Sequence, residues 1–365
     1  MKAKSPNLKE RFARILLKWD KEKNTRQMPW KGEKDPYKIW LSEIILQQTR
    51  VEQGLGYYNR FLLAFPDVHQ LAEAPDERIF KLWEGLGYYS RCRNLIASAR
   101  YIVANLDGKF PSSYESIKEL KGVGPYTASA ISSFAYNLPY AVVDGNVYRV
   151  LARIFGISLP VNSVAGKKVF DKLAQELMKT TEAGRYNQAI MDFGAVVCKP
   201  VAPSCEICMF RRNCFAYNND QVDMLPIKDK KLPLKKRWFY YVFVEKKNEH
   251  GQYRFAIRQR SESDIWKDLF EFPLVEAKIE MEASIVLKEV EKNIGLRKKQ
   301  YSLISISPLF KQQLSHQLIS GRFIRIRLKQ DEKIEKGWQW VSKEQLNELA
   351  FPRYINQFLS NVAVN

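Results

Sequence analysis

Two acidic residues occupy sequence settings that favour a chemical role over simple solvation. Glu43 lies within residues 39–49, where six large apolar side chains surround it. Removing a carboxyl group from water raises its pKa and keeps it protonated near neutral pH, as a general acid requires. Asp144 lies within residues 142–147, at the start of an apolar helix. An aspartate there is most often a helix cap worth about 1 kcal/mol, so position alone leaves both a capping and a catalytic role open.

Four cysteines form a compact group that could hold a metal. Cys198, Cys205, Cys208 and Cys214 are spaced C-x6-C-x2-C-x5-C. This spacing is too tight for two ordinary disulfides in a reducing compartment and suits a metal centre held by thiolates. It leaves two candidates, a structural zinc ion and an iron-sulfur cluster. The fifth cysteine, Cys92, stands apart and is expected to be a small buried residue.

Two glycines lie in a turn between helical segments, in Leu-Lys-Gly-Val-Gly-Pro-Tyr-Thr at residues 120–127. Glycine lets the backbone around Gly122, Val123 and Gly124 approach a ligand closely. The amides at the start of the following helix then point toward an anion such as a phosphate. The residues alone also allow an ordinary turn between two helices.

Length and charge narrow the class of protein. The chain has 365 residues, for which two domains is the better expectation. Lys and Arg exceed Asp and Glu by 19, which favours a polyanionic partner because neutralised phosphates release condensed counterions. The longest uncharged stretch, residues 122–143, is interrupted by two prolines and several serines, so no membrane span is expected. The N-terminus shows no apolar signal region, and a cytoplasmic location is expected.

The spacing of apolar residues divides the chain into two regions. Up to about residue 217 the spacing is mostly helical, with breaks at prolines. Residues 228–237 contain six basic residues and a proline and are predicted to be an exposed linker. Strand-like runs follow at 238–244, 253–257 and 323–328, with helical spacing near 285–294. The sequence therefore predicts a mainly α domain at 1–227, a basic linker at 228–237 and an α+β domain at 238–365.

Taken together, the motifs resemble the MutY family of adenine DNA glycosylases, over nearly the whole chain. The similar segments are residues 42–51 (Ser-Glu-Ile-Ile-Leu-Gln-Gln-Thr-Arg-Val), 86–91 (Leu-Gly-Tyr-Tyr-Ser-Arg), the glycine turn, 143–147 (Val-Asp-Gly-Asn-Val) and the cysteine group. The resemblance implies a helix-hairpin-helix glycosylase domain with an iron-sulfur loop at residues 198–214 that holds a 4Fe-4S cluster. It also implies a NUDIX-like second domain that recognises the lesion.

The resemblance further implies a reaction in base excision repair. This reaction is hydrolysis of the N-glycosidic bond of adenine mispaired with 8-oxoguanine or guanine in duplex DNA. Glu43 would protonate a ring nitrogen of adenine, while Asp144 would stabilise the cationic sugar or form a covalent intermediate. Tyr126 and Asn146 match positions that support this pair. Bifunctional relatives carry a lysine where this chain has Tyr126, and a phenol cannot form an imine, so a monofunctional enzyme is expected.

By the same resemblance, further residues would hold the extruded base, the duplex and the lesion. The adenine pocket would comprise Arg26, Trp30, Leu46 and Gln188. Contacts to DNA would come from Gln48, Thr49, Leu86, Tyr88, Gly122, Val123 and Gly124. Recognition of 8-oxoguanine would involve Leu314, Ser315 and His316. The chain departs from the family at Lys31, which is arginine in many members, at Gln188, which is glutamate in some, and at Leu314, which replaces a phenylalanine.

The second domain is expected to bind rather than to hydrolyse. A working NUDIX hydrolase needs an Arg-Glu-x-x-Glu-Glu helix to hold magnesium, and residues 289–295 lack it. The expected partner is double-stranded DNA with an A:8-oxoguanine or A:G mismatch, bound by a monomer. Two other interpretations are a related glycosylase acting on mismatched or oxidised pyrimidines, and a non-catalytic DNA-binding scaffold. The second domain argues against the first, and the presence of both Glu43 and Asp144 argues against the scaffold.

Overall fold

The computed structural model describes residues 7–229, 233–261, 264–329, 334 and 337–361. It divides into two compact units, one of Met1–Glu73 and Arg93–Lys230, the other of Ala74–Cys92 and Lys231–Asn365. The sequence places residues 74–92 in the first domain, whereas the structure groups them with the second unit. Each unit therefore consists of two separate chain segments, whereas the sequence predicts one continuous segment for each domain.

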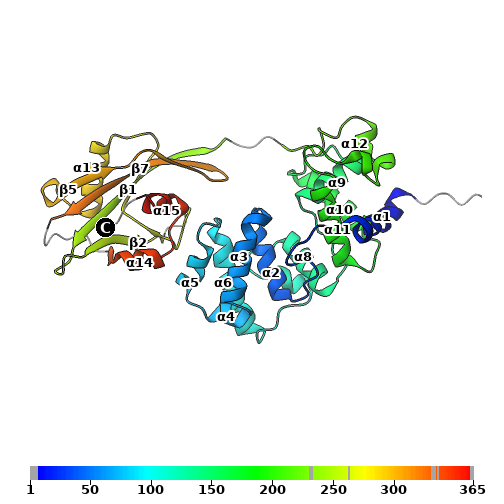
Figure 1. The fold of residues 1–365 in the computed structure, drawn as a ribbon, viewed down its shortest axis with the longest axis horizontal. Coiled ribbons are helices and arrows are strands. Elements are labelled where there is room, and N and C mark those ends of the chain that lie inside the picture. The colour runs from blue at the N-terminus through cyan, green and yellow to red at the C-terminus, as the bar shows by residue number, and fades with distance from the viewer. Residues whose placement is uncertain (1–6, 230–232, 262–263, 330–333, 335–336, 362–365) are drawn as a thin grey trace, which may run out of the picture. The chain divides into compact units, whose positions relative to one another are not determined.

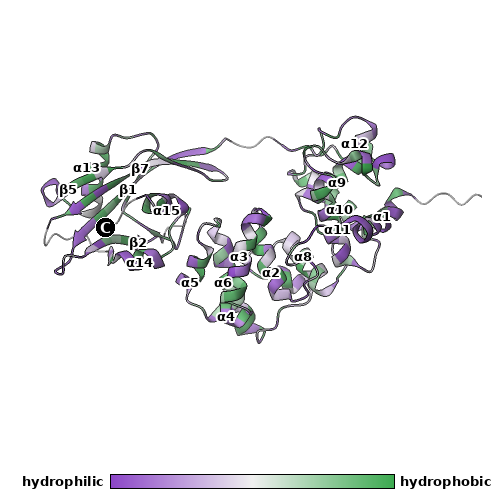
Figure 2. Ribbon diagram, in the orientation of Figure 1, coloured by the Kyte–Doolittle hydropathy of each residue, from purple (hydrophilic) through white to green (hydrophobic). Residues whose placement is uncertain are grey.

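The first unit is helical (Figure 1). Its helices are α1 (Leu8–Lys23), α2 (Pro36–Leu46), α3 (Val51–Ala64), α4 (Val68–Glu73), α6 (Tyr89–Asn105, which begins in the second unit), α7 (Tyr114–Lys118), α8 (Pro125–Tyr136), α9 (Gly145–Phe155), α10 (Val164–Leu177), α11 (Ala183–Val196) and α12 (Phe215–Asn218), with 3-10 helices at Cys205–Ile207 and Arg211–Asn213. These helices carry both hydrophobic and hydrophilic residues (Figure 2). Helices α1, α9, α10 and α11 bury their hydrophobic sides in one core around Phe12, Phe170 and Phe193.

Short polar side chains fix where the helices of this unit begin. Asp35 accepts the amide of Tyr37 just before α2, and Asp144 accepts two amides just before α9. Asn7 and Glu10 form a capping box at α1. Such caps satisfy amides that have no partner in the first helical turn. Helix α2 lies beside α8, and the cap at its start therefore helps to set the position of Glu43.

The second unit is built on a mixed sheet that has eight strands within the described residues. Its elements are α5 (Asp76–Trp83), β1 (Lys235–Lys247), β2 (Tyr253–Gln259), β3 (Phe270–Glu271), β4 (Leu274–Ala277), α13 (Ala283–Ile294), a 3-10 helix at Lys298–Gln300, β5 (Tyr301–Ile306), β6 (Phe310–Gln313), β7 (Gln317–Leu328), β8 (Gln339–Val341), α14 (Lys343–Glu348) and α15 (Arg353–Leu359). The strand order is β3-β2-β1-β7-β5, while β4 pairs with β1, β6 with β7 and β8 with β2. Strands β1 and β7 are parallel, with Tyr241 opposite Phe323. The rings of Tyr241, Phe323 and Phe358 stack on the face that α15 covers.

The predicted change from a mainly α region to an α+β region is confirmed. The three strand-like runs lie inside β1, β2 and β7. Strand β1 begins at Lys235, inside the segment predicted as a linker, and Arg237 is buried. The Arg237 guanidinium contacts Asp264 and Glu276, each at 2.6 Å, and this pairing allows a basic residue to enter the sheet. Within the described residues, no helix is both long and apolar enough to cross a membrane.

Candidate active site

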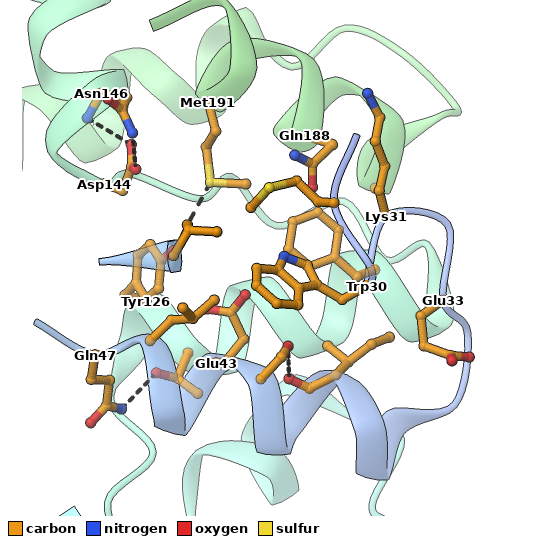
Figure 3. A pocket seen from close by; sticks show the side chains of 18 of the residues that line it. Trp30, Lys31, Glu33, Glu43, Gln47, Tyr126, Asp144, Asn146, Gln188 and Met191 are labelled. Atoms are coloured by element: carbon orange, nitrogen blue, oxygen red, sulfur yellow. Dashed lines mark hydrogen bonds between the residues drawn. The ribbon is translucent and has the colours of Figure 1, made fainter. Parts of the chain in front are cut away.

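A cavity of about 1060 Å³ in the first unit gathers residues that are far apart in the sequence (Figure 3). Its walls come from α2, the start of α8, the start of α9, α11 and the segment between α1 and α2. Its volume is slightly above the usual range of about 300–1,000 Å³ for ligand sites. Most of the residues singled out in the sequence lie on its wall: Arg26, Trp30, Glu43, Leu46, Gln48, Thr49, Gly122, Gly124, Tyr126, Asp144, Asn146 and Gln188.

Glu43 reaches the cavity from α2, a helix that is buried on nearly every side because residues 36–46 are almost all apolar. The pKa of Glu43 is raised to about 7, first by burial and then by the nearby Asp144 carboxylate, and hydrogen bonding with Tyr126 opposes this shift. A carboxyl group with this pKa is protonated in a large fraction of molecules near neutral pH. The residue predicted as general acid therefore has the protonation behaviour that this role needs.

Tyr126 lies in the first turn of α8, next to Glu43 in the cavity (Figure 3). Its hydroxyl lies 4.0 Å from Met191 Sδ. Burial, followed by the charges of Glu43 and Asp144, raises the pKa of Tyr126 well above 10. The phenol therefore keeps its proton, and it acts on Glu43 as a hydrogen-bond donor rather than as a competing acid.

Asp144 is at once the N-cap of α9 and part of the cavity wall. Its Oδ1 accepts the backbone amides of Asn146 at 2.9 Å and Val147 at 2.8 Å, and its Oδ2 accepts Asn146 Nδ2 at 2.7 Å. Burial raises the pKa of Asp144, while these donors and Arg149 act against that shift. The two alternatives that the sequence leaves open are therefore compatible, because the cap holds the same carboxylate that lines the cavity.

Arg149, one turn along α9, supports the contact between Asn146 and Asp144. Its guanidinium donates to Asn146 Oδ1 at 2.8 Å, to the Gly194 carbonyl at 2.6 Å and to the Cys198 carbonyl at 2.7 Å. Because a guanidinium has only donors, it occupies the oxygen of Asn146 and leaves the amide NH2 for Asp144. A continuous set of hydrogen bonds thus joins the Asp144 carboxylate to the backbone of the first clustered cysteine.

The residues predicted for the adenine pocket form another side of the cavity. The rings of Trp30 and Tyr58 pack edge to face with centroids 5.6 Å apart. Arg26 donates to Asp192 at 2.8 Å, and Gln188 donates to the same carboxylate at 2.9 Å. Asp192 is fully buried. The sequence analysis did not identify this carboxylate, because its arginine partner lies 166 positions away along the chain.

The predicted hairpin forms the turn that leads into α8. Gly122 has a φ of +80°, and a Cβ there would lie 2.7 Å from Cβ of Asn94, so glycine alone fits without rearrangement. Gly124 is the N-cap of α8 and supplies no side-chain cap, which leaves the first amides of the helix as donors for an anion. Both glycines are exposed, while Val123 is buried.

The remaining DNA and lesion residues lie in the second unit. Leu86 is buried, whereas Tyr88 is exposed and has a φ of +49°. Leu314, Ser315 and His316 form the turn between β6 and β7, with Ser315 and His316 exposed. The hydroxyl groups of Tyr88 and Ser315 are within hydrogen-bonding contact. The structure therefore brings a residue predicted to contact the duplex next to one predicted to contact the lesion.

The four clustered cysteines line one small pocket beside α9. Arg153 donates to Cys198 Sγ at 3.5 Å. Among the residues that the structure describes, no three Cys, His, Asp or Glu side chains are placed to bind one metal ion together. Four thiolates in one pocket are donors that either a zinc ion or an iron-sulfur cluster could use. Cys92 is fully buried.

Four residues that build or support the cavity were missed in the sequence: Gln47, Arg149, Met191 and Asp192. Gln47 donates to Thr127 Oγ1 at 3.2 Å and so connects the end of α2 with α8. Helical spacing offers a clue only for Met191 and Asp192, because positions three and four after Gln188 share its helix face. The contacts of Gln47 and Arg149 depend on tertiary packing.

Comparison with known proteins agrees with this architecture. Residues 41–178 match the family model of the HhH-GPD superfamily base excision DNA repair proteins, and residues 242–361 match the NUDIX domain. The adenine DNA glycosylase of Buchnera aphidicola subsp. Acyrthosiphon pisum is 32% identical over 97% of this chain and 98% of its own length.

Two solved structures resemble the helical part. A thermostable thymine-DNA glycosylase has a TM-score of 0.53 and 29% identity, covering 58% of this chain and 97% of its own. A non-covalent endonuclease III-DNA complex has a TM-score of 0.50 and 19% identity, covering 59% and 99%, and shows the fold alone. The helical repair domain, the NUDIX domain after it and the near full-length relative establish that the chain belongs to the adenine DNA glycosylase family.

Proposed function

We propose that the enzyme excises adenine paired with 8-oxoguanine or guanine in duplex DNA by hydrolysing the N-glycosidic bond. The observation that carries the proposal is the single cavity in which Glu43 and Asp144 meet Trp30 and Gln188. Its volume of about 1060 Å³ accommodates a purine with its deoxyribose. A base must leave the helix to reach such a site. The names of the full-length relatives support adenine as that base.

Glu43 acts as the general acid in this proposal. It transfers its proton to a ring nitrogen of adenine, the C1′–N9 bond breaks with its electron pair going to the base, and positive charge develops on the sugar. Its pKa of about 7 makes the proton available near neutral pH. Tyr126 orients the carboxyl group through a hydrogen bond.

Asp144 stabilises the sugar cation that this departure creates. A carboxylate about 5 Å from a full positive charge, at an effective dielectric near 20, contributes on the order of 3 kcal/mol, or roughly two decades of rate. This contribution alone is insufficient for an enzyme. We assign the remaining rate enhancement to positioning, to leaving-group protonation and to a covalent bond between C1′ and Asp144. Water then hydrolyses this bond: its hydroxyl goes to C1′, its proton goes to the Glu43 carboxylate, and Asp144 leaves as a carboxylate.

The first prediction concerns the base that is released. Wild-type enzyme is expected to release adenine opposite 8-oxoguanine and opposite guanine, and to leave thymine opposite guanine intact. Single-turnover assays on end-labelled duplexes, with alkali added to cleave abasic sites, measure all three rates. Comparable release of thymine would favour the pyrimidine glycosylase. Binding to the duplexes without release of any base would favour the non-catalytic scaffold.

The second prediction concerns strand cleavage. Because Tyr126 occupies the position at which bifunctional relatives carry lysine, the enzyme is expected to leave abasic DNA uncut unless heat or alkali is added. Borohydride is expected to trap no adduct at the level that a true lyase gives. Cleavage without alkali, together with a strong trapped adduct, would contradict the monofunctional assignment.

We also propose that Cys198, Cys205, Cys208 and Cys214 hold a 4Fe-4S cluster. Their common pocket supports a shared metal centre, and the resemblance of their spacing to the family's cysteine loop favours a cluster over zinc. The cluster would supply four covalent anchors for the segment that follows α11, and no step of hydrolysis depends on it. Enzyme purified without oxygen is expected to be brown and to contain about four irons per chain. A colourless protein with one zinc per chain would contradict this assignment.

The partner we propose is mismatched duplex DNA, bound by a monomer in the cytoplasm. The uncapped amides after Gly124 offer a phosphate site. The exposed Ser315 and His316 of the second unit would read the 8-oxoguanine, with Leu314 in place of a stacking aromatic. The contact between Tyr88 and Ser315 supports a shared duplex surface for these residues.

A further inference from the structure

Asp192 is a buried carboxylate whose hydrogen-bonding capacity is fully used. Its Oδ1 accepts Arg26 Nη1 at 2.8 Å and Gln188 Nε2 at 2.9 Å. Its Oδ2 accepts Asn24 Nδ2 at 2.9 Å and Lys31 Nζ at 3.0 Å. Two donors on each oxygen fill the lone-pair sites of a carboxylate. A fully buried charge needs such partners, but three of them also line the cavity, so the arrangement bears on ligand binding.

The contact to Asp192 fixes which way the Gln188 amide faces. A glutamine amide often has two orientations that exchange its nitrogen and oxygen. A carboxylate offers only acceptors, so the amide nitrogen must face Asp192 and the oxygen must face away. Within the described residues the Gln188 oxygen accepts no hydrogen bond, and the residue lines the cavity. Figure 3 shows Gln188 and Trp30 among the residues that line this cavity.

We infer that Asp192 is a positioning residue of the base pocket, which makes Gln188 present a hydrogen-bond acceptor and so selects bases with an exocyclic amino group. The inference rests on the proposed function, since it concerns how that cavity chooses its base. Asp192 itself is shielded from the ligand by its four partners and acts through Gln188.

The same arrangement explains why a 6-oxo purine would be rejected. Hypoxanthine differs from adenine by a carbonyl where adenine has its amino group. That carbonyl would face the Gln188 oxygen, which opposes two acceptors. Sites built around a specific hydrogen bond reject such analogues strongly. Asp192 also pairs with both Arg26 and Lys31, which holds these two cations on the Asp192 side of the pocket.

A reciprocal exchange tests this assignment. Asp192→Asn must turn its NH2 toward donors on one of its two sides, which disturbs the pocket. Gln188→Glu places two carboxylates at hydrogen-bond distance, where they repel each other. The double variant Gln188→Glu/Asp192→Asn restores a hydrogen bond between these two side chains with its direction reversed, keeps the charge of the pair and again presents an oxygen to the cavity. Arg26 Nη1 then faces an NH2 at position 192, because it shares its acceptor oxygen with Gln188 in the wild type. Release of adenine and of hypoxanthine opposite guanine is measured for each variant under single-turnover conditions.

Each single variant is expected to lower the rate of adenine release by about tenfold or more. The double variant is expected to be at least about threefold faster than the worse single variant, because the contact between positions 188 and 192 is restored while the contact with Arg26 is not. Asp192→Asn is expected to lower hypoxanthine release much less, so discrimination between the bases shrinks. An equal loss on both substrates, or a double variant no better than the worse single one, would overturn the inference. If the wild-type enzyme releases no adenine, the proposed function itself is wrong, and this outcome is distinct from a failure of the inference about Asp192.

Two controls separate positioning from general damage to the fold. Thermal unfolding and duplex binding are measured for every variant, since a merely structural role for Asp192 would lower both without changing base discrimination. Glu176→Gln removes the exposed ion pair with Lys9, whose atoms lie 3.1 Å apart outside the cavity. This variant is expected to match wild type on both substrates.

Discussion

Asp144→Asn is expected to lower adenine release by at least about a hundredfold, and to below detection if the covalent step is obligatory. The substitution removes the charge that faces the sugar cation and replaces the nucleophilic oxygen with an amide. Asparagine is as good an N-cap as aspartate, so α9 is expected to keep its start. The measurement is the single-turnover rate on an A:8-oxoguanine duplex, with duplex affinity determined alongside.

Asp67 provides a matched control for this substitution. Its Oδ1 accepts the Gln70 amide at 2.9 Å at the start of α4, away from the cavity. Asp67→Asn makes the same chemical change at another helix start and is expected to leave the rate unchanged. Comparable rates for Asp144→Asn and wild type would remove the basis of the proposed mechanism. A loss of duplex binding together with activity would instead indicate that the cap, and not the chemistry, was affected.

Glu43→Gln is expected to lower the rate by about a hundredfold to ten-thousandfold, the usual contribution of a general acid. The wild-type rate is expected to fall as pH rises through about 7, because the raised pKa of Glu43 means that the proton is present below this value and lost above it. Protonation of Asp144 would reduce the rate on the acid side, and the two carboxyl groups titrate as a coupled pair. A wild-type rate independent of pH from about 6 to 9 would contradict the assignment.

Stability offers an independent test of the same carboxyl group. A folded-state pKa of about 7, above the ordinary 4.5, means that ionised Glu43 opposes folding. The penalty begins as pH rises above the unfolded pKa and reaches its full size above about 7. Glu43→Gln is therefore expected to unfold at higher denaturant concentration than wild type at pH 8, by up to about 3 kcal/mol, and to show no such gain near pH 4.

Much of this site can be predicted from local sequence. Glu43 stands out because an acid within an almost entirely apolar helix has to be buried. Gly122 stands out because few other residues fit its position in the turn. The change in apolar periodicity after the cysteine group likewise predicts the α+β fold, since helix and strand burial follow different periods. In each case the information lies in short runs of neighbouring residues.

The parts of the fold and of the site that the sequence does not predict depend on contacts between residues far apart in the chain. Asp192 resembles any acid on a helix until Arg26 and Lys31 reach it from a distant segment. Arg237 belongs to a basic segment that the sequence predicts to be exposed to solvent. In the structure, Asp264 and Glu276 pair with its charge inside the sheet. The grouping of residues 74–92 with the second unit is also a product of tertiary packing. Such pairings follow from the folded chain and not from spacing.

The close crossing of α9 and α11 extends the set of positions at which activity can be lost by mutation. At Gly194 in α11 a Cβ would lie 2.6 Å from Cβ of Asn146, the residue that donates to Asp144. Even alanine at 194 would therefore displace the Asn146 amide that donates to the Asp144 carboxylate, although glycine contributes no functional group of its own. A genetic screen for mutator alleles should therefore recover substitutions at Gly194 as well as at Glu43 and Asp144, although Gly194 has no reactive side chain.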